Sequence, residues 1–515
     1  EGSTSTNEID MVFNKKRAND RKLWLENYDR NAYLNTTKDD VSFEEFINND
    51  LIHFSKYDND RSIPNLCDGL KISLRKILYS AFKKKLNSEI KVAQFSGYVS
   101  EHSGYHHGEA SLNGAIIGLS QDYVGSNNIN LFTPKGQFGT RLLGGKDAAS
   151  ERYIYTHLNQ LTRLIYPEID DALLNYLDDD GTLVEPIYYV PIIPMILVNG
   201  TKGIGTGFST DIMCHNPLQI ISYLEAKLKN KVNKSESNII EPYYRGFKGK
   251  IYPVDDNRKK YIIKGVYEII GKDKIKITEL PIGTWTQDYK EFLESLINDN
   301  KVSKDAKTKT KIKAKDDYIK DFIDMSTDIN IEFEVTFYPG ILSTLLNEKH
   351  ENGIEGIEKY LKLYTSQSTT NMHLFNPKEQ LKKYETIYNI IDEYYEVRYE
   401  FYKKRKTYLI SKLGNELKFL SAKAQFIQYN LDDKIDLRKK SKTQINEIME
   451  SFKFQLGEDK SYNYLIKMPM DSVSKENVEK LMKEHGEKEA QLNEVKSNTI
   501  EQMWLKELGD LKKKL

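Results

Sequence analysis

Apolar residues recur at helical spacing in a segment near the start of the chain. Between residues 70 and 84, large apolar side chains follow one another at steps of three or four positions, which places them on one face of a helix. The members of this face are Leu70, Leu74, Ile77, Leu78 and Phe82. Residues 108–123 form a second segment, whose small and apolar side chains suit close contact with a partner helix. Two such helices around a loop predict a helix-turn-helix unit.

The same spacing extends much further in the last part of the chain. Apolar and aromatic residues recur every three or four positions in residues 384–401 and again in residues 409–427, with charges on the other faces. Residues 430–442 interrupt this pattern, and residues 478–495 resume it as a returning helix. Two antiparallel helices with a small globular tip predict a dimerising coiled-coil arm. An ordinary helical bundle is the alternative.

Shorter helices are expected near both ends of the chain. Residues 15–25 have the pattern of a basic amphipathic helix, and residues 41–47 have that of a second short helix. Residues 1–54 therefore look like a connector rather than a domain. Near the other end, Thr499 and Gln502 have the spacing of a capping box that starts the last helix.

Between these helical regions, residues 208–372 alternate short β-rich runs with helices, which predicts an α+β module. The expected strands are residues 250–254, 261–270, 274–280 and 329–337. Residues 185–198 are also strand-like, although Pro191 and Pro194 interrupt them. Residues 301–320 carry eight lysines, and we expect a solvated loop there.

Length and composition indicate the class of protein. A chain of 515 residues is too long for one hydrophobic core and predicts two to four domains. Its 39% hydrophobic and 30% charged residues are typical of a globular protein. No apolar run approaches the ~18 residues of a membrane span, and no signal peptide opens the sequence. The two isolated cysteines, Cys67 and Cys214, argue for a reducing compartment and against disulfides or a zinc site.

Net charge alone does not indicate a nucleic-acid partner, because 76 basic residues balance 76 acidic ones. Charge is nevertheless segregated locally, since residues 71–91 contain seven basic residues and one acidic residue. Lys71, Arg75 and Lys76 lie mainly off the apolar face of the expected helix. They could contact a phosphate backbone, or they could form a solvated basic surface.

One pair of neighbouring residues has the chemistry of covalent catalysis on a phosphodiester. Arg152 and Tyr153 follow a stretch rich in glycine and alanine at residues 144–150. Tyrosine can act as a nucleophile once a cation or base activates its phenol, and arginine can hold a phosphodiester while negative charge develops on it. The chain has 34 tyrosines, most of which must simply pack. From spacing alone, Tyr155 is an equal candidate.

Two histidines, His106 and His107, stand immediately before the second expected helix. Paired histidines could be metal ligands, a general base or structural groups. Their position before a helix N-terminus favours an anion site, because free backbone N–H groups and the helix dipole point there.

A glycine-rich stretch at residues 199–207 follows the strand-like run. It matches neither the P-loop pattern nor the dinucleotide-binding pattern, so nucleotide binding is not favoured. The alternative is that its glycines let the backbone approach DNA closely, while Ile204 acts as an apolar wedge between base steps.

Several segments together resemble one protein family. The sequence GGKDAASERYIYT (residues 144–156) resembles the active-site segment of type IIA DNA topoisomerases, in the branch shared by eukaryotes and large DNA viruses. Similar motifs, in order along the chain, are RSIPNLCDGLKISLRK (61–76), YHHGE (105–109), GQFGTR (136–141), PMILVNGTKGIGTG (194–207), ITELPIGTWT (277–286) and NYLIKMPM (463–470). The resemblance covers nearly the whole chain.

This resemblance implies roles for individual residues. Tyr153 would be the nucleophile, Arg152 would stabilise the transferring phosphoryl group, and His107 would support it. Ile204 would intercalate and bend DNA. The implied contacts to DNA are Arg61, Lys71, Arg75, Lys76 and His106. Many family members carry Pro-Gly-Gln where this chain has Ile72-Ser73-Leu74, a departure that bears on local helix geometry but not on the cations.

The implied fold is a multidomain α+β protein. A connector (residues 1–54), which in the family follows a metal-binding TOPRIM domain, precedes a winged-helix (helix-turn-helix) DNA-binding domain with the active-site tyrosine (55–190). A tower domain of α/β structure (191–372) comes next. A long antiparallel coiled coil with a globular C-gate (373–515) would form the dimer.

The implied function is that of the DNA-binding and cleavage core of an ATP-dependent type II DNA topoisomerase. A homodimer would cut double-stranded DNA through 5′-phosphotyrosyl links, pass a second duplex and religate the break. The protein would act inside the cell, with DNA, either in the nucleus or, if it is viral, in a cytoplasmic viral factory. Mg²⁺ and ATP would be bound by the TOPRIM and ATPase portions of the same enzyme and not by this chain. We therefore expect the chain alone to bind and bend DNA but to cleave it poorly or not at all.

Two other classes of protein share part of the pattern. A non-catalytic, DNA-bending coiled-coil scaffold would use the helix pair and Ile204 but not Tyr153. A strand transferase similar to tyrosine recombinases would also form a phosphotyrosine, but it would link to the 3′-phosphate and need no metal.

Overall fold

The computed structural model describes residues 3–35, 37, 40–231, 239–298, 318–457, 459–469 and 473–515. Within these ranges the chain is a multidomain α+β protein, as expected. It divides into two compact units, Glu1–Arg398 with Leu508–Leu515, and Tyr399–Glu507. No helix in the described ranges is both long and apolar enough to cross a membrane.

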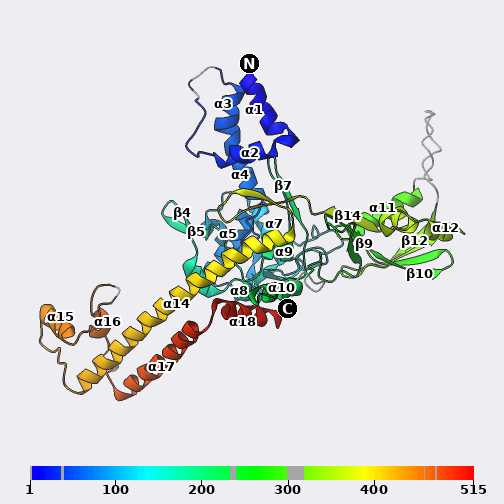
Figure 1. Cartoon of the computed structure of the whole chain (residues 1–515). Coiled ribbons are helices and arrows are strands. Elements are labelled where there is room, and N and C mark those ends of the chain that lie inside the picture. Colours follow the sequence, from blue (N-terminus) through cyan, green and yellow to red (C-terminus); the bar gives the residue numbers. More distant parts are fainter. Residues whose placement is uncertain are drawn as a thin grey trace. The chain divides into compact units, whose positions relative to one another are not determined.

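The N-terminal part of the first unit is helical. Its helices are α1 (Ser3–Phe13), α2 (Ala18–Glu26), α3 (Phe43–Phe46) and α4 (Ile52–Ser62), and a π-helical turn (Ile47–Leu51) joins α3 to α4 without a break. A capping box between Ser42 and Glu45 starts this run. The helices expected at residues 15–25 and 41–47 are confirmed, but the second one is only the start of a longer run. α4 leads from the N-terminal helices into the body of the unit (Figure 1).

Three helices and a small sheet follow α4. They are α5 (Ile72–Lys84), α6 (Val92–Ser103) and α7 (Glu109–Ser120), with β1 (Ile90–Lys91), β2 (Phe132–Lys135) and β3 (Tyr155–Leu158) in the antiparallel order β1-β3-β2. α5 and α7 are the two helices that the hydrophobic pattern predicts, and Ile77, Leu78 and Phe82 of α5 are buried. The pattern does not predict α6, which packs against both of them.

The buried run after residue 186 is not the strand that its composition predicts. β4 (Tyr176–Asp179) and β5 (Thr182–Pro186) form a hairpin, and the chain is then irregular until the short helix α9 (Met195–Asn199). Pro191 and Pro194 have no N–H to donate to a strand ladder, although their apolar neighbours Ile192 and Ile193 are buried. The expected strand at residues 185–198 is therefore wrong beyond its first two residues.

The alternation of strands and helices expected in residues 208–372 is confirmed. A hairpin of β6 (Thr201–Ile204) and β7 (Ser209–Ile212) leads to α10 (Pro217–Leu228). The short helix α8 (Thr162–Ile165) comes before this region, between β3 and β4. The later strands are β8 (Lys250–Pro253), β9 (Lys260–Lys264), β10 (Val266–Gly271), β11 (Lys274–Glu279), β12 (Ile319–Asp324), β13 (Phe333–Phe337) and β14 (Tyr364–Ser368). They form two sheets, ordered β10-β11-β13-β12 and β14-β9-β8.

One face of the four-stranded sheet carries the core of this region. Alternate residues of β11 and β13, such as Ile275, Ile277 and Val335, are buried, because successive side chains of a strand point to opposite faces. The helices α11 (Thr286–Asn298), α12 (Ile341–Asn347) and α13 (Gly356–Tyr360) contribute to the same core. The lysine-rich run is outside the described residues except for 318–320.

Long helices dominate the last part of the chain, as the sequence predicts. After a hairpin of β15 (Met372–Phe375) and β16 (Leu381–Tyr384), α14 (Ile387–Leu431) extends for 45 residues. Then come α15 (Lys442–Ser451), α16 (Asn463–Ile466), α17 (Lys475–Ser497) and α18 (Ile500–Lys512). In the second unit α17 packs with α14, and Lys488 forms an ion pair with Glu416 at 2.7 Å. The predicted capping box is confirmed, since Gln502 N donates to Thr499 Oγ1 at 3.2 Å.

A buried ion pair joins the loop between β2 and β3 to strand β11. The Arg141 guanidinium donates to Glu279 at 2.5 Å, and the two side chains are only 7% and 1% exposed. Arg141 belongs to the GQFGTR motif and Glu279 to the ITELPIGTWT motif. Two motifs that lie far apart in the sequence are therefore in direct contact, and their contact anchors the loop.

Replacing Glu279 should test this anchor. Glu279→Leu would leave the Arg141 guanidinium buried without its partner, which typically costs about 3–5 kcal/mol. We expect a lower Tm by circular dichroism and faster tryptic cleavage within residues 136–154. As a control, Glu332→Gln removes a more exposed partner, that of Lys276, and should leave both measurements unchanged. Equal behaviour of the two variants would contradict an anchoring role.

Candidate functional site

The loop between β2 and β3 presents the Arg152–Tyr153 pair to solvent. It folds back on itself, because the Asp147 carboxylate accepts hydrogen bonds from Thr140 N at 2.9 Å and Thr140 Oγ1 at 2.5 Å. Gly139 has a φ of +94°, and a Cβ there would lie 2.5 Å from the Gly145 carbonyl oxygen. Only glycine allows both this backbone conformation and this close approach.

The end of this loop, just before β3, leaves its two reactive groups accessible. Tyr153 is 71% exposed, and Arg152 is also exposed. The Arg152 guanidinium carbon lies 5.8 Å from the centroid of the Tyr153 ring, and its Nε donates to Ser150 Oγ at 3.2 Å. A phosphodiester bound there could therefore meet a phenol and a permanent cation together.

Tyr155 has a different environment from Tyr153. It belongs to β3, where it pairs with Lys91 on one side and Lys135 on the other. Its side chain is 37% exposed, and the Lys91 ammonium lies 5.9 Å from its ring centroid. Its backbone is thus fixed in a sheet, whereas Tyr153 is on the loop.

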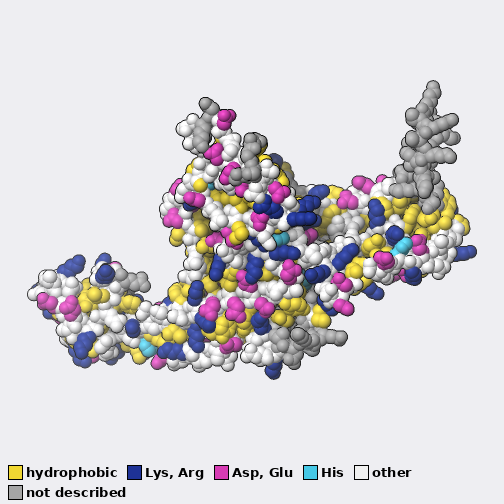
Figure 2. Space-filling model, turned by 45° about the horizontal axis from the view of Figure 1, so that its top comes forward, with side chains coloured by type: hydrophobic (Ala, Val, Ile, Leu, Met, Phe, Trp, Pro, Cys, Tyr) yellow, Lys and Arg dark blue, Asp and Glu magenta, His cyan; other side chains and the backbone are white. Residues whose placement is uncertain are grey.

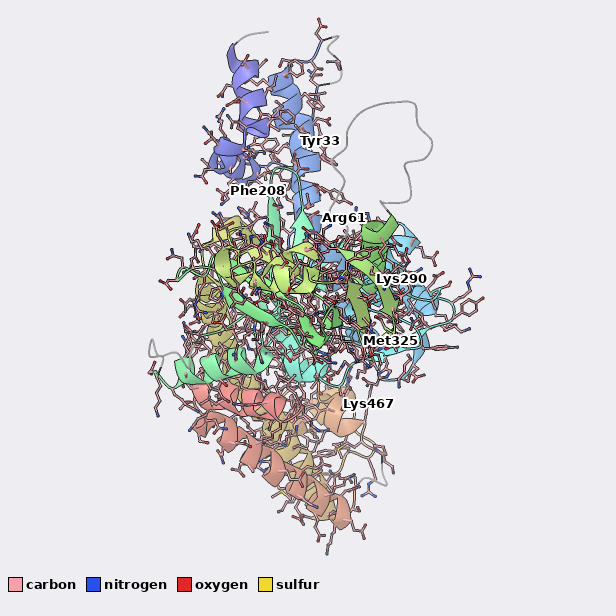
Figure 3. All side chains as sticks on the ribbon, turned by 90° about the vertical axis from the view of Figure 1, so that its right-hand side faces the viewer. Tyr33, Arg61, Phe208, Lys290, Met325 and Lys467 are labelled. Atoms are coloured by element: carbon pink, nitrogen blue, oxygen red, sulfur yellow. The ribbon has the colours of Figure 1, made fainter. Side chains whose placement is uncertain are left out.

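His106 and His107 line a second part of the candidate site, a cavity of about 400 Å³. Arg61, at the end of α4, and Lys76, on α5, line the same cavity, and Figure 3 shows Arg61 where the N-terminal helices meet the body. Burial lowers the pKa of His107, and the nearby charges of Arg61, His106 and Lys76 lower it further. His107 directly precedes Gly108, the N-cap of α7, so backbone N–H groups are available to an anion there.

Three basic residues have different environments, namely Lys71 at the N-cap of α5 and Arg75 and Lys76 within the helix. Lys71 Nζ donates to the Lys202 carbonyl at 2.9 Å, and burial lowers its pKa. Lys76 Nζ is shared between Glu185 at 2.8 Å and the Ser103 carbonyl at 2.5 Å.

Arg75 does not face solvent as the helical pattern predicts. It is 6% exposed, and its guanidinium donates to both carboxylate oxygens of Asp68, at 2.7 and 3.1 Å. Asp68 is fully buried and also accepts a hydrogen bond from Tyr189 N. Because this pair occupies the guanidinium, we leave Arg75 out of the proposed DNA interface.

Ile204 stands at the end of β6 and is 78% exposed. The hairpin behind it is tied to α4. Asn59 Nδ2 donates to the Thr206 carbonyl at 2.9 Å, and Thr206 Oγ1 donates to Asp58 at 2.8 Å. The turn is therefore held on one side while the isoleucine remains accessible.

The glycines of this hairpin serve a purpose that the sequence does not reveal. A Cβ at Gly203 would lie 2.1 Å from the Ser62 carbonyl oxygen, and one at Gly205 would lie 2.6 Å from Asn59 Oδ1. Both glycines thus allow close contact with α4. The expectation that these glycines let the backbone approach DNA stays a prediction.

The surface around these groups is mixed in charge. Figure 2 shows Lys and Arg side chains below the N-terminal helices, with Asp and Glu interspersed. In the part of the chain that the structure describes, no group of three or more His, Cys, Asp or Glu side chains could hold a metal ion. These residues alone do not fit a metal site, so we derive no reaction step through one.

Comparisons with known proteins identify the family. The family model for the C-terminal associated domain of TOPRIM matches residues 1–59, and the model for the A subunit of DNA gyrase/topoisomerase IV matches residues 61–509. The chain belongs to the type IIA DNA topoisomerases. DNA topoisomerase 2 of Plasmodium falciparum is 41% identical over 98% of the chain, and that of Acanthamoeba polyphaga mimivirus is 38% identical over 98% of it.

A solved structure supports the family assignment for the whole length of the chain. The crystal structure of the Plasmodium falciparum topoisomerase II DNA-binding, cleavage and re-ligation domain matches with a TM-score of 0.86 and 40% identity. The match covers 100% of this chain and 70% of that one. The chain spans 37% of the length of the Plasmodium relative and 43% of the mimivirus relative.

Sequence reasoning missed several residues that position the topoisomerase motifs. Tyr57, Asp58 and Asn59 come just before the RSIP motif, yet nothing local signals that they contact His107 or Thr206. Their partners are 50 to 148 positions away, so only the tertiary fold brings them together.

Replacing Gly203 should show whether contact with α4 positions the isoleucine. Gly203→Ala places a methyl group against the Ser62 carbonyl, and such overpacking costs about 1–3 kcal/mol. DNA bending by this chain is itself a prediction from Ile204, and we expect Gly203→Ala to reduce it about fivefold or more, measured by fluorescence resonance energy transfer across a labelled duplex. Gly97→Ala meets nothing within 4 Å and is the matched control. Unchanged bending by Gly203→Ala would show that the glycine is not needed.

Proposed function

We propose that this chain is the DNA-binding, cleavage and religation core of a type II DNA topoisomerase. The observation that carries the proposal is the exposed Tyr153 beside Arg152 on a loop held by buried contacts. The solved relative is described by its title as a DNA-binding, cleavage and re-ligation domain. Tyr153 is the proposed nucleophile rather than Tyr155, which lies within a strand.

The proposed reaction exchanges one phosphodiester for another. The Tyr153 phenol loses its proton, and its oxygen attacks the phosphorus of a DNA strand. The bond from phosphorus to the 3′-oxygen breaks, the leaving oxygen takes up a proton as the 3′-hydroxyl, and a 5′-phosphotyrosyl ester remains. Religation is the reverse reaction. Since one ester replaces another, the step needs no external energy source.

The cationic groups would stabilise the charge that develops during this exchange. Arg152 would donate hydrogen bonds to the phosphoryl oxygens. Donors held in place stabilise the negative charge that develops on these oxygens in the transition state. His107 would support the same phosphate or an activating water, and Arg61, Lys71, Lys76 and His106 would contact the DNA backbone. Enzymes of this family use Mg²⁺ and ATP, whose binding we propose to reside in other portions of the enzyme.

The element order supports a winged-helix assignment for the DNA-binding region. α5, β1, α6, α7, β2 and β3 follow one another as a helix, a strand, two helices and two strands. The three strands form one antiparallel sheet, and the loop with Tyr153 would be its wing. α7 would then be the helix that enters the major groove.

We propose the remaining domains on the same basis. The sheets within residues 191–372 would belong to the tower, and α14 with α17 would form the coiled-coil arm of a homodimer. The compact unit Tyr399–Glu507 lies inside the proposed arm of residues 373–515. The proposed connector of residues 1–54 ends within the helical run of α3 and α4.

Double-stranded DNA is the proposed substrate, and Ile204 is its proposed wedge. An apolar side chain that is 78% exposed gains from insertion between base steps, where it leaves water and bends the duplex. The proposed location is inside the cell, with DNA. A relative from Dictyostelium discoideum, 37% identical, is named as mitochondrial.

A nucleophile test would check this proposal. In the full-length protein that carries this chain, Tyr153→Phe should lower DNA cleavage by a factor on the order of 10³ or more, because no other group replaces the phenol oxygen. Tyr155→Phe is the matched control and should retain cleavage. The measurement is the yield of linear DNA after denaturant quenching of reactions on a supercoiled plasmid.

Two outcomes would count against the assignment. Loss of cleavage in Tyr155→Phe but not in Tyr153→Phe would move the nucleophile to the strand. Cleavage by neither the unsubstituted protein nor its variants, with DNA bending intact, would favour the non-catalytic scaffold.

A further inference from the structure

A buried arginine of α2 is bonded to the end of α1. Arg21 is 6% exposed, and its Nη1 donates to the Met11 carbonyl at 2.9 Å and to the Asn14 carbonyl at 2.7 Å. Met11 belongs to the last turn of α1, where carbonyl groups have no partner within the helix and the helix dipole favours a cation. The guanidinium therefore fixes α2 to the end of α1.

The same side chain lies against the turn between β6 and β7. The Arg21 guanidinium carbon is 5.8 Å from the centroid of the Phe208 ring, within the range of a cation–π contact. A Cβ at Gly207 would lie 3.0 Å from Arg21 Nε, so the backbone of the turn passes close to the guanidinium. Figure 3 shows Phe208 where the hairpin meets the N-terminal helices. Arg21 thus packs on the two residues that precede β7.

The turn is tight, so its two sides move together. Residues 205–207 separate Ile204 from Phe208, and Gly205 N donates to the Phe208 carbonyl at 2.9 Å. Ile204 also pairs with Ser209, the first residue of β7. A displacement of Phe208 would therefore be passed directly to Ile204, the proposed wedge.

Other contacts support different parts of this hairpin. Thr206 is bonded to α4, and Asn371 Nδ2 donates to Ser209 Oγ at 2.7 Å. Among these supports, Arg21 is the one that comes from α2 and also reaches α1. Arginine suits this position because a planar guanidinium can donate from its edge to carbonyl groups while its face lies on an aromatic ring.

We propose that Arg21 is a positioning residue for DNA bending, which fixes the turn of the β6–β7 hairpin to the end of α1 and thereby sets the direction in which Ile204 meets the duplex. This inference rests on the proposed role of Ile204 as a wedge. Arg21 itself need not touch DNA. The N-terminal helices, which match the TOPRIM-associated family model, would in this way control how strongly the duplex is bent.

The variant Arg21→Met keeps an apolar stem of similar length and removes the guanidinium. We expect the ratio of bent to straight duplex to fall about fivefold, which is the effect of one contact with the net strength of an ordinary hydrogen bond. The measurement is fluorescence resonance energy transfer across a labelled duplex, with the full-length protein at saturating concentration so that weaker binding does not enter. Arg21→Lys keeps the charge but not the planar group, and it should cause a smaller loss in the same direction.

The chain offers a matched control in the same helices. Arg17 also joins α1 to the start of α2, since its Nη1 donates to the Asn7 carbonyl at 3.0 Å and its Nε donates to Asp20 at 2.6 Å. Within the described residues, none of its hydrogen bonds or ion pairs reaches the β6–β7 hairpin. Arg17→Met therefore tests for a general loosening of the two helices and should leave bending unchanged.

A second comparison tests whether Arg21 acts through the wedge. Ile204→Val shortens the wedge by one carbon and leaves part of the bending to measure. If the two residues act on the same step, Arg21→Met should cause a smaller loss in the Ile204→Val background than in the unsubstituted protein. Equal losses in the two backgrounds would show that Arg21 affects bending by another route and would overturn the inference.

The remaining outcomes separate this inference from the proposed function. Unchanged bending by Arg21→Met, or an equal loss in Arg17→Met, would overturn the positioning role while leaving the wedge in place. If Arg21→Met does not fold, Arg21→Lys is compared with Arg17→Lys in the same way. Full bending by Ile204→Ala would instead overturn the proposed wedge, and the role of Arg21 with it.

Discussion

The close contact between α4 and the β6–β7 hairpin is the constraint on which the proposed DNA-binding surface depends. A side chain at Gly203 would collide with the Ser62 carbonyl, so only glycine at this position allows the hairpin to pack this closely against α4. α4 in turn carries Tyr57 toward His107 and Arg61 toward the cavity. One helix thus supports the hairpin of the proposed wedge, carries a cation and contacts a histidine, so a shift of α4 would displace all three. The N-terminal helices therefore bear on the proposed DNA binding, although they carry none of the proposed catalytic groups.

The tyrosine loop obeys a second constraint of the same kind. Gly144 has a φ of +61°, and a Cβ there would lie 2.3 Å from the Trp285 indole, while Arg141 is paired with buried Glu279. Arg141 is buried in its contact, whereas the Arg152 and Tyr153 side chains of the same loop are exposed. Exposed reactive groups contribute little to folding stability, and buried anchors compensate for their exposure. The GQFGTR and ITELPIGTWT motifs thus provide buried contacts that support the loop, whereas the exposed reactive groups belong to a third motif, the one with Arg152 and Tyr153.

Local signals in the sequence were sufficient for much of the fold. The spacing of Leu78 and Phe82 predicts α5, and the polar pair Thr499 and Gln502 predicts the start of α18, because both signals depend on neighbours within one or two helical turns. α6 gives a weaker signal, since its segment includes Gly97 and several polar residues. The run after Pro186 is as apolar as a buried strand, but apolar composition alone does not distinguish a strand from irregular buried chain.

The site was predictable where chemistry was local and not where it depended on distant partners. The adjacency of Arg152 and Tyr153 is visible in the sequence, and so is an isoleucine among glycines. The burial of Arg75 depends on Asp68 and Tyr189 together, and the contact of Tyr57 with His107 spans 50 positions. Helical periodicity places Arg75 off the apolar face, but it does not reveal that the buried Asp68 carboxylate lies on that side of the helix.

The most direct measurement is to map the covalent adduct on the protein. The full-length enzyme would be quenched with denaturant during cleavage of a duplex labelled at each end, digested, and analysed by mass spectrometry. The account predicts a nucleotide on the peptide that contains Tyr153, joined through a 5′-phosphate, with a free 3′-hydroxyl on the other DNA fragment. An adduct on Tyr155, or a link through a 3′-phosphate, would contradict it.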